Sequence, residues 1–310
     1  MTLAGARVAI TGASGFCGAA VARAAARAGA EVMCLGRRPG PLGRHVFWDA
    51  TVGRPDLEGA DLIVHLAAAV GDPPPGRAAE AAYWAVNVAG TDRLLEAAGD
   101  RPLVWVSSAS VYDPRVRHSR VTEDHPIGGQ RSAYGRTKAA GERRALATGA
   151  VVLRPRAVYG PGDPHLLPRL IRAVRGRYLL LPGPDVRLSL TAVENLAEAC
   201  LAALGWPSGA YNIADPQPYA RDAVLRAALA AIGHPARLVH VPVRVAVAAA
   251  TAASMLAGLS RSGPSILTQY TVDQLAHGMV LDISRATAQG YQPQRTFSDF
   301  VARLEPGARP

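Results

Sequence analysis

TGASGFCG, residues 11–18, joins an apolar run, RVAIT at 7–11, to an alanine-rich segment typical of a helix. Its glycines, Gly12, Gly15 and Gly18, recur at every third position. Glycine permits the sharp turn and the close backbone approach that a pyrophosphate requires, and the following helix directs free N–H groups at it. A plain tight turn is the alternative interpretation. The position of the loop between strand and helix predicts a dinucleotide-binding unit made by Gly12, Ser14, Gly15, Phe16, Cys17 and Gly18.

Outside this loop, short apolar runs alternate with helical segments along the first half of the chain. The runs are almost continuously apolar, which is typical of parallel strands buried on both faces. The alternation predicts an α/β protein with a doubly wound parallel sheet, a Rossmann fold, and a smaller C-terminal substrate-binding domain. We expect the NAD(P)-binding domain over residues 1–163, with return segments near 188–204, and the substrate domain over residues 164–310. The expected strands are Arg7–Thr11, Glu31–Gly36, Asp61–Ala68, Leu103–Ser108 and Ala150–Pro155, and the expected helices include Gly18–Ala28, Tyr83–Ala98 and Tyr134–Ala147.

The end of the second expected strand bears on the choice of dinucleotide. Sites selective for NAD(H) usually place an acid there to bond the ribose 2′-hydroxyl, whereas arginine suits a 2′-phosphate. Arg37 and Arg38 occupy this place. We therefore expect a preference for NADP(H), with NAD(H) as the alternative and with two solvated surface arginines as the competing explanation. Asp49, in FWDAT at the expected end of a further strand between those at 31–36 and 61–68, is placed either to bond the adenine edge or to cap the following turn.

The segment SAYGRTKAAGE at 132–142 contains the only lysine of the chain, Lys138, although lysines and arginines together number 34. Tyr134 lies four residues earlier, so both side chains share one helix face. Ser108 ends the strand expected at 103–108. A phenol can exchange a proton with a carbonyl oxygen, a nearby ammonium lowers the pKa of that phenol, and a hydroxyl can hold the oxygen. This set predicts hydride chemistry at a carbonyl; a surface helix pair is the alternative for Tyr134 and Lys138.

Seven motifs occur in order along the chain: TGASGFCG, VHLAA, NVAGT, SSASVY, YGRTK, LRPRAVYGPGD and LDISRATAQGYQP. On these motifs the chain resembles the extended short-chain dehydrogenases/reductases, the NAD-dependent epimerase/dehydratase superfamily, over nearly its whole length. The resemblance implies that Ser108, Tyr134 and Lys138 are the catalytic triad and that two helices per subunit form a homodimer. It implies a cofactor site lined by Gly12, Gly15, Gly18, Asp49, Ala50, Leu66, Ala67, Ala68, Asn87, Tyr134, Lys138, Pro155 and Val158. We expect Ser108, Ser110, Tyr134 and Arg156 to line the substrate site.

The segment LRPRAVYG bears on the branch of that family. Its nucleotide-sugar enzymes usually carry an asparagine that bonds the substrate diphosphate, and this chain has Ala157 there. The later motifs resemble the 3β-hydroxysteroid dehydrogenase type. We therefore expect an oxidoreductase that interconverts a ketone and a secondary alcohol on a largely apolar small molecule. The alternatives are a nucleotide-sugar epimerase or dehydratase with bound NAD, and a non-enzymatic NADP-binding regulator. Arg156 either binds a substrate carboxylate or braces its loop.

The composition is that of a folded globular protein, with 49% hydrophobic and 19% charged residues and a net charge of +10. The arginines are dispersed and aromatic residues are only 5%, which argues against nucleic acid as a partner. Three widely spaced cysteines argue against a metal site and favour a reducing, cytoplasmic compartment. We expect no leader peptide and no stable membrane insertion, because the apolar segment 245–260 falls short of the roughly 20 residues that span a bilayer. A buried or interfacial helix is expected there, with weak surface attachment as the alternative.

Overall fold

A seven-stranded parallel sheet forms the centre of the structure, a computed structural model that describes residues 3–71, 77–116, 120–164, 166–259 and 269–304, without the side chains of 254–259 and 269–270. The strands in spatial order are β11 (Gly209–Ile213), β6 (Val151–Pro155), β5 (Leu103–Val106), β4 (Leu62–His65), β1 (Arg7–Thr11), β2 (Glu31–Gly36) and β3 (Arg44–Phe47). Every neighbouring pair in this sheet runs parallel. The predicted doubly wound α/β class is confirmed.

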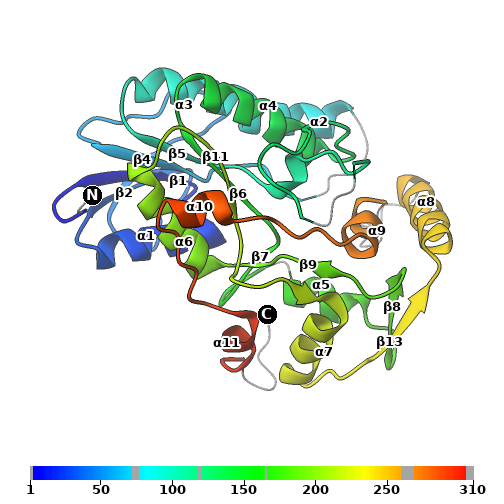
Figure 1. Ribbon diagram of the computed structural model, residues 1–310. Coiled ribbons are helices and arrows are strands. Elements are labelled where there is room, and N and C mark those ends of the chain that lie inside the picture. The colour runs from blue at the N-terminus through cyan, green and yellow to red at the C-terminus, as the bar shows by residue number, and fades with distance from the viewer. Residues whose placement is uncertain (1–2, 72–76, 117–119, 165, 260–268, 305–310) are drawn as a thin grey trace.

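Helices cover both faces of this sheet, which explains the continuous apolar runs (Figure 1). Along β1, Val8 and Ile10 enter the core on one face, whereas Ala9 enters the core on the other. One face packs against α1 (Phe16–Arg27), α6 (Val193–Ala202) and α10 (Ser284–Ala288). The other face packs against α3 (Gly90–Ala98) and α4 (Ala133–Ala147), beside which lies α2 (Arg77–Trp84).

The strand expected at 103–108 ends at Val106. Two further expected elements are shorter or divided in the structure. The strand expected at 61–68 ends at His65, because the N–H groups of Leu66 and Ala67 bond the Thr11 side chain. The helix expected at 83–98 is interrupted by a π-helical turn, Ala85–Ala89, between α2 and α3. Both departures lie next to the predicted cofactor site.

The remaining segments form a smaller, separately packed half. Its strands are β7 (Val158–Tyr159), β8 (Tyr178–Pro182), β9 (Arg187–Leu188), β10 (Thr191–Ala192), β12 (Tyr219–Ala220) and β13 (Arg237–Val241). Its helices are α5 (Leu166–Ala173), α7 (Arg221–Ala231), α8 (Val243–Leu259), α9 (Gln269–Ala276) and α11 (Phe297–Val301). Leu179, Leu225 and Phe300 belong to the core of this half.

The expected return of residues 188–204 to the sheet corresponds to α6, which packs against α1. β11 and α10 also lie in the half that contains the sheet, beyond that expected segment. The boundaries 1–163 and 164–310 therefore stay a prediction. The apolar segment at 245–260 begins as expected within a helix, α8, in which Ala246 and Ala250 are buried; Ser260 lies outside the described residues. None of the described helices reaches the length and apolar content that a membrane span requires.

Candidate active site

The strand order locates the candidate site. From β1 the chain continues to β2 and β3 on one side, and then returns to β4, β5 and β6 on the other. Parallel sheets of this kind bind ligands outside the carboxyl ends of the strands where the direction changes, here β1 and β4. The Thr11 Oγ1 atom joins these two ends, because it accepts N–H bonds from Leu66 (3.1 Å) and Ala67 (3.0 Å). The glycine loop and the segment 66–68 therefore lie together at this edge.

The glycine loop has no space for a side chain at two of its glycines. Gly12 has a φ of +70°, and a Cβ there would lie 2.8 Å from the backbone nitrogen of Ala67. A Cβ at Gly18 would lie 2.2 Å from the carbonyl oxygen of Gly12. Gly15 is the N-cap of α1 and has no side chain with which to cap the helix. The N–H groups of the first turn are therefore left for a ligand. This arrangement fits a pyrophosphate, and contact of the loop with a cofactor stays a prediction.

Gly18→Ala is expected to lower the free energy of unfolding by about 1–3 kcal/mol, the usual cost of overpacking. The added Cβ would meet the Gly12 backbone, which cannot rotate away as a side chain can. The displaced loop should also bind NADPH more weakly. Urea unfolding and a fluorescence titration with NADPH measure the two effects. Gly205→Ala is the matched control because a Cβ there meets nothing within 4 Å; equal behaviour of the two variants would contradict the prediction.

Cys17, in the first turn of α1, is not a reactive thiol. Burial, with a smaller effect of the Asp163 charge, raises the pKa of its thiol to about 12. The thiol therefore stays protonated at neutral pH, and Cys17 packs partly buried against the core; its contact with a cofactor stays a prediction. The effect of Asp163 also indicates that the loop after β7 lies near the glycine loop.

The predicted residues after β2 and β3 are exposed or half-buried. Arg37 and Arg38 are exposed, and neither forms an ion pair with an acid within the described ranges. Asp49 Oδ1 accepts hydrogen bonds from Thr51 N (2.9 Å) and Thr51 Oγ1 (2.7 Å). These bonds, with a smaller effect of Arg37, hold the pKa of Asp49 below its usual range. The capping role considered for Asp49 is thus present, and its bond to adenine stays a prediction.

Asn87 and Ala50, both expected beside the cofactor, are engaged by neighbouring segments. The Asn87 side chain accepts from Ala69 N (2.7 Å) and donates to Ala69 O and Thr137 Oγ1 (both 3.0 Å). It therefore ties the loop after β4 to α4 from its place in the π-helical turn. Ala50 O accepts from Arg93 Nη1 at 2.8 Å. Their contacts with a cofactor stay predictions.

Lys138 is buried against the strand that leads to Ser108. It is only 2% exposed, its Nζ donates to Val106 O at 2.6 Å, and Nζ lies 3.7 Å from the ring centroid of Trp105. Both partners belong to β5. A compact ammonium fits between a carbonyl and an aromatic face, whereas a guanidinium fork is broader and planar. This environment gives a physical reason why position 138 carries the only lysine of the chain, whereas the other 33 of its 34 lysines and arginines are arginine.

The burial of Lys138 makes the stability of the protein depend on pH. Burial lowers the pKa of Lys138 from 10.5 to about 7, and the nearby Glu142 carboxylate acts in the opposite direction. Between these two values the unfolded chain binds a proton that the folded chain lacks, so raising the pH favours folding. Below pH 7 both states are protonated and this gain is absent.

We therefore expect the free energy of unfolding to rise between pH 7.5 and 9.5 in the wild type, relative to Lys138→Met, by about 1 kcal/mol per pH unit. Urea unfolding of both proteins at several pH values gives this difference, in which the contributions of groups that do not interact with Lys138 cancel. Parallel pH profiles of the two proteins would show that Lys138 does not titrate in this range.

The segments that carry Ser108 and Tyr134 are in direct contact. Ser108 follows β5, and its Oγ accepts from Ser110 N (3.2 Å) and Ser110 Oγ (3.0 Å). A Cβ at Gly135 would lie 2.8 Å from Ser110 O, so the first turn of α4, which bears Tyr134, packs closely on this loop. Tyr134 is half-buried there. The structure thus brings together the segments of the three predicted catalytic residues, whose roles stay predictions.

Arg156 and Ala157 follow Pro155 at the end of β6, just before Val158. Arg156 is buried, and its Nη1 donates to Ser189 O at 3.2 Å, so it braces this segment; a bond to a substrate carboxylate stays a prediction. Ala157 is exposed and has a φ of +45°, which makes it the one non-glycine residue with positive φ among those described. Asparagine and glycine adopt this left-handed conformation more readily than alanine. The backbone at residue 157 thus has a conformation that suits asparagine, the residue that nucleotide-sugar enzymes usually carry there. Ala157 lacks the amide side chain of that asparagine.

A buried ion pair behind the site was not predicted from the sequence. Glu142, one turn after Lys138 on α4, is 0% exposed, and Arg154 on β6 is 2% exposed. Arg154 Nη2 lies 2.5 Å from Glu142 Oε1, and Arg154 Nε contacts both carboxylate oxygens. The second oxygen of Glu142 accepts a short hydrogen bond from Ser107 Oγ. Because Ser107 precedes Ser108, this ion pair holds the strand end that presents the predicted catalytic serine.

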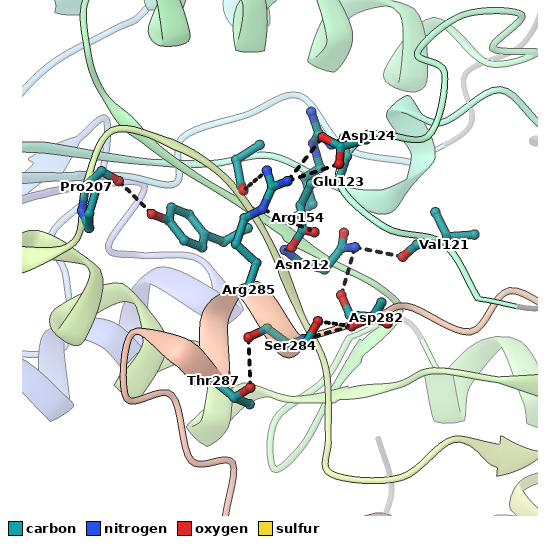
Figure 2. Close-up of polar contacts among 12 residues, drawn as sticks. Val121, Glu123, Asp124, Arg154, Pro207, Asn212, Asp282, Ser284, Arg285 and Thr287 are labelled. Carbon is teal, nitrogen blue, oxygen red and sulfur yellow. Dashed lines mark hydrogen bonds and ion pairs between the residues drawn. The ribbon is translucent and has the colours of Figure 1, made fainter.

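The ion pair continues into a polar network that reaches the C-terminal segment. Arg154 Nη1 donates to Tyr112 Oη (2.9 Å), which donates to Asn212 Oδ1 on β11 (2.6 Å). Figure 2 shows the next contacts, in which Asn212 Nδ2 donates to the carbonyls of Val121 (2.9 Å) and Asp282 (3.1 Å). At the rim of this network, Arg285 Nη2 on α10 lies 3.1 Å from Asp124 Oδ1. The loop between β5 and α4 is thus fastened to residues that are distant in sequence.

A family model described as "NAD dependent epimerase/dehydratase family" matches residues 8–214. The chain is 29% identical to the 2-alkyl-3-oxoalkanoate reductase of Stenotrophomonas maltophilia (strain K279a), over 96% of this chain and 98% of that protein. It is 31% identical to the 4-hydroxy-2-methyl-3-oxo-4-farnesyl-3,4-dihydroquinoline-1-oxide ketoreductase of Stigmatella aurantiaca, over 79% of this chain and 78% of that protein. It is 29% identical to the human sterol-4-alpha-carboxylate 3-dehydrogenase, decarboxylating, over 61% of this chain and 55% of that protein.

Solved structures share the fold over nearly the whole chain. MoeE5 in complex with UDP-glucose and NAD matches with a TM-score of 0.73 and 25% identity, over 97% of both chains. A short-chain dehydrogenase/reductase superfamily protein from Agrobacterium tumefaciens with bound NAD matches with a TM-score of 0.74 and 23% identity, over 96% of this chain and 95% of that one.

Proposed function

Because the chain belongs to the NAD dependent epimerase/dehydratase family, as an oxidoreductase of the extended short-chain dehydrogenase/reductase type, we propose that it reduces a ketone to a secondary alcohol on a largely apolar small molecule. The observation that carries this proposal is the buried Lys138, which donates to Val106 O at the end of β5, two residues before Ser108, and lies one helical turn from Tyr134. Relatives that span most of the chain are named as reductases of 3-oxo compounds.

The nicotinamide, when bound, supplies the hydride that adds to the carbonyl carbon. Tyr134 donates its phenolic proton to the carbonyl oxygen as that oxygen gains negative charge. Ser108 donates a hydrogen bond to the same oxygen and holds it in place. Lys138 in its ammonium form stabilises the phenolate that Tyr134 becomes. The products are the secondary alcohol and the oxidised cofactor.

The proposed substrate class follows from the segment after β6. Ala157 has no group that can donate a hydrogen bond to a diphosphate, although it is exposed and adopts the conformation that asparagine favours. Relatives are named for alkyl 3-oxo acids, for a farnesyl-bearing ketone and for a sterol. We propose an apolar ketone of this general kind, with reduction as the working direction.

A nucleotide-sugar epimerase is the second candidate, favoured by the solved structure that holds UDP-glucose and NAD. The two are separated by supplying NADPH with a 2-alkyl-3-oxoalkanoic acid and a 3-ketosteroid, and by supplying UDP-glucose and UDP-glucuronic acid separately. Oxidation of NADPH on at least one apolar ketone is expected. Conversion of a UDP-sugar by protein that retains NAD(H), with no ketone reduced, would overturn the proposal in favour of the epimerase.

NADPH is the proposed cofactor because Arg37 and Arg38 can pair with a 2′-phosphate. The double variant Arg37→Ser/Arg38→Ser is expected to raise the Kd for NADPH about 10- to 100-fold, the usual value of hydrogen bonds to a charged group. The Kd for NADH should stay unchanged, since NADH lacks the phosphate. Titration of both cofactors against both proteins measures this, and a parallel loss for the two cofactors would assign the arginines another role.

We also propose a homodimer, which rests on the family resemblance alone. Sedimentation velocity of the wild-type protein measures its mass, and a monomer at micromolar concentration would contradict this part of the proposal.

A further inference from the structure

Two long stretches of the smaller half contain no acidic residue. Residues 164–184 and 223–272 have none, although the chain has 24 acids, and they carry eight arginines. Within the described ranges, Arg226 pairs with Asp222, whereas Arg169, Arg172, Arg175, Arg177, Arg237 and Arg244 are exposed and form no ion pair with an acid. This part of the surface therefore carries an uncompensated positive charge.

Two of the acids that flank these stretches are engaged largely inside the protein. Asp222 is only 1% exposed, and it pairs with the buried Arg221 at 2.9 Å as well as with Arg226. Asp273 has a side chain that is 14% exposed, and it pairs with Arg131. Of the two acids that flank residues 164–184, Asp163 is buried and Asp185 is exposed, so one exposed flanking carboxylate stands against the six exposed arginines that form no ion pair with an acid.

The same stretches expose apolar side chains on one side of a small sheet. β8 and β13 pair in register, with Tyr178 beside Arg237 and Leu180 beside Val239. These four residues, the β8–β13 face, point away from the core, because Leu179 between them packs inward with α7. Leu180 is 58% exposed, Tyr178 40% and Val239 38%. The two strands lie at the edge of the smaller half, on the side of α8 (Figure 1).

We propose that the β8–β13 face docks on an anionic lipid bilayer. Tyrosine and arginine side chains suit the boundary between headgroups and acyl chains, and Leu180 and Val239 supply the apolar contact. The surrounding arginines attract anionic headgroups. Docking is peripheral, since no described helix is long and apolar enough to cross a membrane. It would bring compounds dissolved in the bilayer to the substrate-binding half, and it does not depend on the proposed reduction.

A second copy of the chain suits this face less well. In a two-fold symmetric contact the same patch meets itself, so Arg237 and its neighbours would face other arginines. The stretches offer no acid to compensate them. Charge complementarity therefore favours an anionic surface over self-association.

The test is cosedimentation of the full-length protein, without cofactor or substrate, with vesicles of phosphatidylcholine alone or with phosphatidylserine added. Binding is expected only with phosphatidylserine, and it should fall steeply with added salt. Arg175→Gln/Arg177→Gln is expected to weaken binding roughly thirtyfold, from the usual contribution of each basic residue near an anionic surface. Leu180→Ser should weaken it further by removing the apolar contact.

The matched control is Arg23→Gln/Arg27→Gln, which makes the same charge change at two exposed arginines of α1. It should bind phosphatidylserine vesicles as the wild type does. No binding to these vesicles, or an equal loss in both double variants, would overturn the proposal. A dimer that dissociates in the Leu180→Asp variant in the absence of lipid would assign the face to a second copy and overturn it as well. Ketone reduction in solution is measured separately, so failure of docking is distinguishable from failure of the proposed activity.

Discussion

Tyr134→Phe is expected to lower kcat for ketone reduction by about two to four orders of magnitude, the usual contribution of a positioned general acid. The Kd for NADPH should change little, because the variant keeps the ring on α4 and removes only the hydroxyl. Stopped-flow or steady-state oxidation of NADPH gives kcat, and a fluorescence titration gives the Kd.

Tyr178→Phe is the matched control for this loss of a phenol group. Tyr178 lies on β8 in the smaller half and is 40% exposed, so full activity is expected. The assignment of Tyr134 would be wrong if its variant kept more than a tenth of the wild-type kcat. Lys138→Arg should be nearly as inactive, because the site between Val106 O and the Trp105 ring is closed to solvent.

The largest effect on stability is expected from Arg154→Met. Removal of one partner leaves Glu142 as an uncompensated buried charge, which usually costs about 3–5 kcal/mol. Both side chains are almost fully enclosed, at 3% and 1% exposure. Urea unfolding at pH 7.5 measures the loss. kcat should fall as well, because Ser107 loses the fixed carboxylate that holds the strand end before Ser108.

The double variant Glu142→Gln/Arg154→Met separates a lost attraction from an unpaired charge. It removes both charges, so it should recover much of the stability that the single variant loses. Arg27→Met, at an exposed position of α1, should stay within about 0.5 kcal/mol of the wild type. A single-variant loss below 1 kcal/mol, or a double variant less stable than the single one, would contradict the role given to this ion pair.

The sheet could be predicted because its strands carry local signals. Arg7–Thr11 and Glu31–Gly36 begin and end as predicted, since each is a continuous apolar run bounded by polar residues or glycine. α1 begins at Phe16 rather than at Gly18, because Gly15 already serves as its N-cap. Local pattern thus identified the elements and left their ends uncertain by a few residues.

β11 could not be predicted in the same way. Gly209–Ile213 is a short segment flanked by proline and glycine, and its place in the sheet depends on pairing with β6, which lies far upstream. The smaller half has the same character, because its strands are two to five residues long and pair across long loops. Contacts between distant segments leave little trace in local periodicity.

The candidate site likewise contains residues that local patterns predicted and residues that only the structure reveals. Spacing and position in the chain indicated Gly12, Ser108, Tyr134 and Lys138, because each obeys a local geometric rule. Glu142 and its buried partner Arg154 resemble ordinary surface charges in the sequence, and only the packing of α4 against β6 reveals them. The substrate contacts depend on the packing of the smaller half and stay predictions.

Transfer of hydride from NADPH to a ketone tests the proposed reaction most directly. NADPH deuterated at the reactive C4 position is incubated with the purified protein and an apolar 3-oxo acid, and the product is examined by NMR. One deuterium is expected on the new carbinol carbon, with NADP formed in equal amount, and no such transfer is expected from Tyr134→Phe. Absence of deuterium from every ketone tested, together with interconversion of a UDP-sugar without net change in the cofactor, would contradict it.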